Sequence, residues 1–149
     1  MTFKQKIYHR YHQLIQDRID AFRDMIVALT EDSKNDAKGS AGDKHETALS
    51  MMHIEQEKLN TKLKEVLTQK AVLDKLDPSV VAETIILGSL VKANGIYLYL
   101  SLALPKINVE GINVIALSPQ SPLGNKLMGE KTGFSFDINT TQYTIEEIL

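Results

Sequence analysis

Apolar residues in residues 1–77 recur at alternating steps of three and four, which predicts long amphipathic helices. The first series has one polar break, at Arg18, and consists of Ile7, Tyr11, Leu14, Arg18, Phe22, Met25 and Leu29. The second has two, at Gln56 and Lys70, and consists of Leu49, Met52, Gln56, Leu59, Leu63, Val66, Lys70 and Leu73. A stretch rich in Gly, Ser, Asn and Asp separates them. We therefore expect residues 1–77 to form an antiparallel coiled-coil hairpin.

Asp77-Pro78 ends the helical pattern, because proline disfavours helical geometry in the residue before it. The remainder, residues 78–149, predicts a second domain built mainly of strands. Expected strands cover residues 84–92, 97–104, 106–109, 112–117, 134–138 and 143–148. Asn94-Gly95 and Glu110-Gly111 predict tight turns between strands. We expect a small antiparallel sheet.

One segment interrupts the strands with the signature of a short helix. Ser121 is placed as the N-cap, Pro122 as the first helical residue and Gly129 just past the end. The fold class predicted for the chain is therefore α+β, an N-terminal helical hairpin followed by a small β domain with one short helix.

Composition narrows the classes of function. The 149 residues carry 17 Lys and Arg against 19 Asp and Glu, so the chain has no bulk positive charge for independent DNA binding. The absence of cysteine excludes disulfides, thiolate nucleophiles and Cys-based metal sites. The N-terminus is too charged for a signal peptide, and no apolar stretch approaches membrane-spanning length. We expect a soluble cytoplasmic protein without a membrane partner.

Asp43 and Glu46 are the candidate chemical groups, in an acidic tip near residues 36–47. A spacing of three puts both carboxylates on one helix face, where they could share a divalent cation with waters and another protein's ligands. The same spacing also fits a capping box, with Asp43 as N-cap and Glu46 bonding back to it. Ser40 is an alternative N-cap one turn earlier, which would leave both carboxylates projecting. The spacing leaves these interpretations open.

Two motifs resemble a known family, the Gre transcript cleavage factors of bacterial RNA polymerase. The tip segment Gly42-Asp43-x-x-Glu46-x-Ala48 is similar to that family's Gly-Asp-x-x-Glu-Asn-Ala motif. The segment Ser121-Pro122-Leu123-Gly124-x-x-Leu127-Met128-Gly129 resembles a segment of its FKBP-like C-terminal domain. That segment reads Ser-Pro-[Ile/Leu]-[Ala/Gly]-x-x-Leu-[Ile/Leu/Met]-Gly. The order of coil, tip, coil and β domain agrees over nearly the whole chain. The sequence departs from the family pattern at Thr47 and Ser50, and lacks its N-terminal Thr-x-x-Gly segment.

The resemblance implies a transcription elongation factor that binds RNA polymerase through its secondary channel. It implies that Asp43 and Glu46 help to hold a Mg²⁺ ion shared with the polymerase, and so stimulate the polymerase's cleavage of backtracked RNA. The protein would have no activity alone and would meet nascent RNA only within that complex. The FKBP-like domain would dock at the rim of the channel, with Ser121, Pro122, Leu123 and Gly124 as the partner-binding residues.

Two other hypotheses remain. The departures at Thr47 and Ser50 leave room for a noncatalytic regulator that occludes the channel or competes with cleavage factors. A coiled-coil interaction module unconnected with polymerase is the third, and the two motifs in register argue against it.

Overall fold

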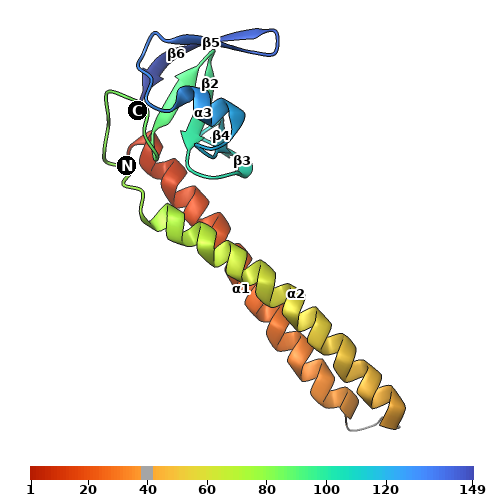
Figure 1. The fold of residues 1–149 in the computed structure, drawn as a ribbon. Helices are drawn as coiled ribbons and strands as arrows, with labels where there is room; N and C mark the ends of the chain where they lie inside the picture. Colours follow the sequence, from red (N-terminus) through yellow and green to blue (C-terminus); the bar gives the residue numbers. More distant parts are fainter. Residues whose placement is uncertain (38–41) are drawn as a thin grey trace. The chain divides into compact units, whose positions relative to one another are not determined.

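A computed structural model describes residues 1–37 and 42–149, with the backbone alone at residues 33, 35–37 and 42–45. The helices are α1 (Phe3–Ala37), α2 (Gly42–Asp74) and α3 (Pro122–Leu127). The strands are β1 (Leu90–Ala93), β2 (Ile96–Leu100), β3 (Leu104–Val109), β4 (Ile112–Leu117), β5 (Ser135–Ile138) and β6 (Thr141–Ile148). The predicted α+β class, a helical hairpin followed by a sheet with one short helix, is confirmed (Figure 1).

The chain forms two compact units. The sheet unit consists of Met1–Tyr11 and Val72–Leu149, so it includes the first turns of α1 and the last residues of α2. The hairpin unit consists of His12–Ala71. The predicted division into domains at residues 77 and 78 stays a prediction.

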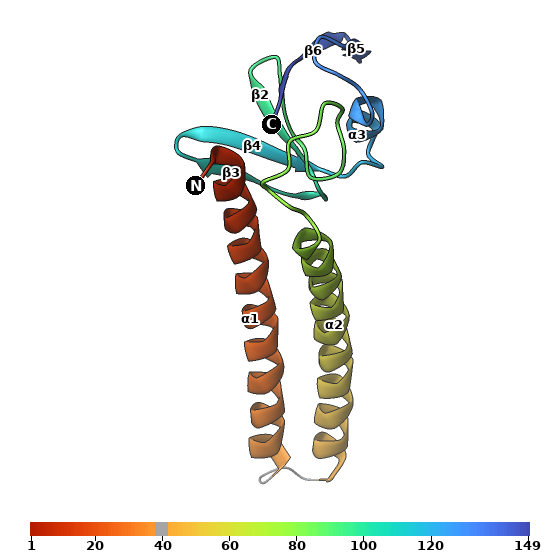
Figure 2. The same cartoon turned by 90° about the vertical axis from the view of Figure 1, so that its left-hand side faces the viewer.

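In the hairpin unit α1 and α2 run antiparallel and side by side (Figure 2). The seam predicted for α2 is confirmed, because all eight of its positions are buried or half-buried. Even the polar Gln56 takes part, since its Nε2 donates a hydrogen bond to Oγ1 of Thr30 on α1 at 3.0 Å. The Gln56 amide is therefore satisfied across the helix pair.

The seam predicted for α1 is partly wrong. Arg18 is exposed and Met25 is half exposed, whereas Ile15 and Ile19 are almost completely buried. Burial in α1 advances mostly in steps of four, through Ile7, Tyr11, Ile15 and Ile19. Ile7 and Tyr11 belong to the sheet unit and Ile15 and Ile19 to the hairpin unit, so a single seam along α1 does not have to serve both.

The sheet unit has strand order β3-β4-β2-β1-β6-β5. Four of its neighbouring pairs are antiparallel, but β2 and β4 are parallel, with Tyr97 beside Val114. The expected purely antiparallel sheet is therefore corrected to a mixed one. The cause is that the β3–β4 hairpin places β4, rather than β3, next to β2.

The strand expected at residues 84–92 is shorter than predicted. Only Leu90–Ala93 forms β1, and Thr84 makes a single bridge to Lys131. Between them the chain turns, with the Ser89 amide donating to the Ile86 carbonyl at 3.0 Å and Gly88 at a φ of +95°. This turn uses the Ile86 carbonyl that a continuous strand would need for its ladder.

Both faces of the central strand β2 are buried. Leu98 and Leu100 belong to a core that includes Leu127 of α3. On the other face, Tyr97 and Tyr99 contact the rings of Phe3 and Tyr11, in the first turns of α1. Leucines and tyrosines therefore alternate across β2, and both sets are packed because the sheet unit covers each face. The strand expected at residues 97–104 ends at Leu100, and Leu104 begins β3.

Candidate functional site

The tip acids lie in the first turns of α2. Because α2 begins at Gly42, Asp43 and Glu46 are its second and fifth residues. Glu46 is exposed, while the side chain of Asp43 lies outside the described residues. A spacing of three places the two positions on one face of the helix. That the two carboxylates serve one ligand stays a prediction.

The capping interpretation depends on where the helix begins. An N-cap residue precedes the first helical residue, and Asp43 follows it. Ser40, the alternative cap, and the rest of the predicted tip at residues 38–41 lie outside the described residues. The choice between Asp43 and Ser40 as the N-cap therefore stays open. A carboxylate in the first turn is still stabilised by the helix dipole.

The donor set at this place is incomplete for a metal ion. Mg²⁺ requires about six oxygen ligands in near-octahedral geometry and keeps several waters. Asp43 and Glu46 could supply two carboxylates to one side of such a shell. In the described part of the chain, no group of three or more His, Cys, Asp or Glu side chains could hold an ion. A Mg²⁺ site at Asp43 and Glu46, with its other ligands from a partner, stays a prediction.

The second predicted site is the start of α3. The Ser121 side chain caps this helix, accepting a hydrogen bond from the Gly124 amide at 3.1 Å and donating one to the Ser118 carbonyl at 2.7 Å. Pro122 stands at the first helical position, where its missing N–H removes no hydrogen bond. The capping prediction is confirmed. Ser121 has a structural task whatever it binds.

The surrounding backbone leaves no space for a side chain at Gly124. A Cβ built on it would lie 2.0 Å from the Ser118 carbonyl oxygen, well inside any real contact. Leu123 is half-buried against the core and Leu127 is completely buried in it. Within this motif Pro122 is the exposed position among the four predicted partner-binding residues. The packing accounts for Ser121, Leu123 and Gly124, and leaves Pro122 on the surface.

One buried charge was not expected from the sequence. Lys4 in the first turn of α1 is only 6% exposed, and its Nζ donates to the carbonyl oxygens of Val80 at 2.6 Å and Leu149 at 2.9 Å. Burial lowers the pKa of Lys4, against the attraction of Asp77. No sequence pattern distinguishes such a lysine from a solvated one. Lys4 therefore links the first turn of α1 to Val80 and to Leu149 within the sheet unit.

No helix within the described residues combines the length and the apolar character needed to cross a membrane.

Comparison with known proteins adds little to this site. Searches against known protein families and against curated proteins both find no match. Among solved structures, one titled as the structure of the transcription factor Gfh1 is similar, with a TM-score of 0.35 and 18% identity over 92% of each chain.

Proposed function

We propose that this chain is a transcription elongation factor of the Gre type, which binds bacterial RNA polymerase through the secondary channel. Its role is to stimulate the polymerase's Mg²⁺-dependent cleavage of backtracked RNA, without activity of its own. The observation that carries the proposal is the pair Asp43 and Glu46, one turn apart at the end of the hairpin where α2 begins.

The hairpin has suitable dimensions for reaching a buried site. Residues 42–71 of α2 extend over roughly 45 Å at about 1.5 Å per residue. No proline or glycine interrupts either helix between residues 3 and 37 or between residues 43 and 74. A straight helix pair can therefore carry two carboxylates into a channel too narrow for a folded domain.

Asp43 and Glu46 would complete the polymerase's metal site rather than form one. A second Mg²⁺ in such a site lowers the pKa of a bound water and stabilises the charge that develops on the scissile phosphate. The two carboxylates would supply negative charge and oxygen ligands on the side that the polymerase leaves open. This accounts for a donor set that is too small by itself.

The sheet unit would make the docking contact with the polymerase. The exposed Pro122, held rigidly by the Ser121 cap and the buried Leu127, presents a fixed surface at the start of α3. We propose that this turn, Ser121 to Gly124, contacts the polymerase and sets how far the hairpin enters. Pro122 would make the contact, and the other three residues would hold it in place.

The test uses stalled, backtracked elongation complexes incubated with the full chain and Mg²⁺. On this proposal the RNA is shortened, and Asp43→Asn or Glu46→Gln each abolishes most of the shortening while binding to the polymerase persists. Glu57→Gln is the matched control, because Glu57 is also an exposed acid of α2 but lies several turns from the tip. It should cleave like the wild type.

A second candidate has a specific observation in its favour. Thr47 and Ser50 replace residues of the family pattern, and both are exposed in the turns that carry the acids. A noncatalytic regulator with these residues would occupy the channel and block RNA synthesis without shortening RNA. If the wild type inhibits extension and no cleavage product forms, the cleavage proposal fails and this one takes its place.

A further inference from the structure

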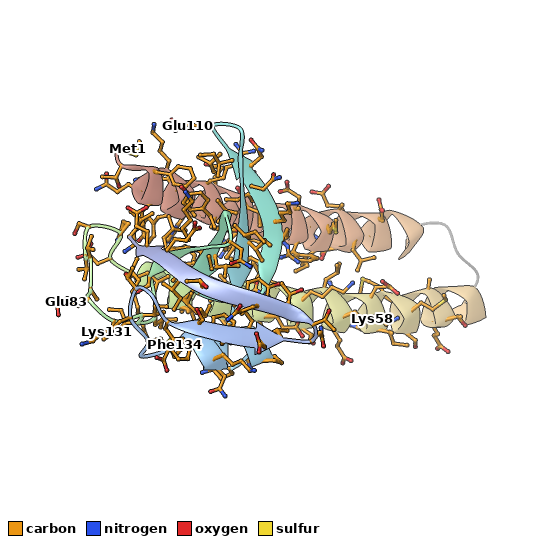
Figure 3. The ribbon with its side chains drawn as sticks, turned by 90° about the horizontal axis from the view of Figure 1, so that it is seen from above. Met1, Lys58, Glu83, Glu110, Lys131 and Phe134 are labelled. Atoms are coloured by element: carbon orange, nitrogen blue, oxygen red, sulfur yellow. The ribbon has the colours of Figure 1, made fainter. Side chains whose placement is uncertain are left out.

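Two tight turns stand side by side at one end of the sheet. Asn94-Gly95 joins β1 to β2, and Glu110-Gly111 joins β3 to β4, each with both residues at positive φ. Because β2 and β4 are parallel neighbours, the turns that precede them project from the same end. A groove of about 550 Å³ lies there, which we call the turn groove. Figure 3 shows Glu110 at the end of its turn, beside the first turn of α1.

The lining of the turn groove is mainly apolar. Ile96 and Ile112 follow the two turns directly, and Ile115 lies further along β4; their exposed fractions are 38%, 36% and 38%. Tyr97 also lines the groove and is half-buried. Aliphatic side chains that meet in a concave surface and stay in contact with water are typical of an interaction site.

The charged side chains that line the groove are both lysines, Lys92 and Lys106. Lys92 Nζ lies 5.8 Å from the centre of the Tyr97 ring. Two nearby acids are engaged elsewhere: Glu110 bonds to Lys6, and Glu146 accepts a hydrogen bond from the Gly95 amide at 2.9 Å.

Glu147 stands opposite Lys92 on β6 but is not part of the lining. The groove therefore offers an apolar floor with positive charge on its sides.

We propose that the turn groove binds an acidic segment of a partner protein. An aliphatic or aromatic side chain of that segment would lie between Ile96 and Ile112, and its carboxylates would pair with Lys92 and Lys106. The charge of the lining selects acidic partners, because like charges facing each other in an interface are unfavourable. This inference goes beyond the proposed function and does not rest on it, since it uses neither the tip acids nor Pro122.

The experiment selects peptides from a random heptapeptide display library on the immobilised full chain. We expect the enriched peptides to combine two or more acidic residues with a central Leu, Ile, Phe or Trp. Synthetic copies should bind less tightly as the NaCl concentration rises. They should bind about tenfold more weakly to the double variant Lys92→Gln, Lys106→Gln, in line with the loss of two charge pairs.

The matched control is Lys75→Gln, Lys131→Gln, which removes two exposed lysines of the same unit that do not line the groove. Lys131 lies on the opposite side of the unit from Glu110 in Figure 3. This control should bind like the wild type, and thermal melts check that both double variants are folded. Selection that yields no peptide, peptides without acidic bias, or equal binding to the Lys92 and Lys106 variant would overturn the proposal. So would a dimer that dissociates when these two lysines are changed, because a second copy would then occupy the groove.

Discussion

The rings of Tyr11 and Tyr99 stack almost parallel, with centroids 6.0 Å apart and planes inclined by 9°. Both side chains are completely buried, one from the third turn of α1 and the other from the centre of β2. Their hydroxyls differ. Tyr11 Oη donates to the Pro105 carbonyl at 2.9 Å, whereas Tyr99 Oη has no hydrogen-bond partner within the described residues. This pair anchors the start of α1 on the sheet.

Replacing each tyrosine by phenylalanine should have opposite effects on stability. Tyr99→Phe removes a buried hydroxyl without a partner, so the free energy of unfolding should rise by about 1 kcal/mol. Tyr11→Phe leaves the Pro105 carbonyl unpaired and should lower it by about 1 kcal/mol. Urea unfolding of the two variants beside the wild type measures both changes. Equal changes of the same sign would show that the two hydroxyls are equivalent.

Stability should fall in alkali. Burial raises the pKa of Tyr11 from its ordinary value of 10.0 to about 12, and raises that of Tyr99 further. The folded state then holds these protons more tightly than the unfolded state. Stability from this source is complete below about pH 10 and is lost as the pH rises through about 12. Melting temperatures across this range should decline less steeply in the double variant Tyr11→Phe, Tyr99→Phe.

Lys4→Met should destabilise the sheet unit. The methionine keeps most of the buried aliphatic chain but leaves the carbonyl oxygens of Val80 and Leu149 without their donor, at a cost of about 1–3 kcal/mol. Lys6→Met is the control, because Lys6 is half-exposed and pairs with Glu110 at the surface. Such pairs contribute about 0–1 kcal/mol. Chemical denaturation distinguishes the two, and equal losses would argue against the role of Lys4.

The burial observed along α1 predicts that Ile19 contributes to stability and that its neighbour Arg18 does not. Ile19 is 1% exposed, so Ile19→Ala should cost about 2–5 kcal/mol through lost burial and the cavity left behind. Arg18→Ala should change stability by less than about 0.5 kcal/mol, because Arg18 is exposed. Thermal unfolding of the two variants gives the ranking. The reverse order would restore the seam that the sequence alone predicts.

Gly124→Ala should be among the most disruptive single-methyl changes in the sheet unit. The added Cβ meets the Ser118 carbonyl, a backbone atom that cannot move aside cheaply, and we expect a loss of about 3 kcal/mol or more. Gly111→Ala meets no atom within 4 Å but sits at a φ of +80°, so it should cost only about 1–2 kcal/mol. Comparing their melting temperatures separates steric clash from backbone strain.

Several structural features could be predicted from the sequence because they depend on interactions between residues close together in the chain. The Asn94-Gly95 and Glu110-Gly111 turns, the Ser121 cap and the seam of α2 all depend on residues close together in the chain. Proline, glycine and capping side chains act through short-range sterics and hydrogen bonds, which hardly change with tertiary context. The spacing of Asp43 and Glu46 is equally local, although their use requires a partner.

Other features were decided only by tertiary structure. The sequence of α1 allows two alternative apolar faces. Packing buries Ile15 and Ile19 in preference to Leu14 and Arg18. Strand composition cannot say that β4 rather than β3 pairs with β2, since that depends on which edge the β3–β4 hairpin joins. Lys4 is buried because two carbonyl groups distant in sequence meet its ammonium. Each of these outcomes depends on the free energy of contacts between residues far apart in the chain, which no local pattern specifies.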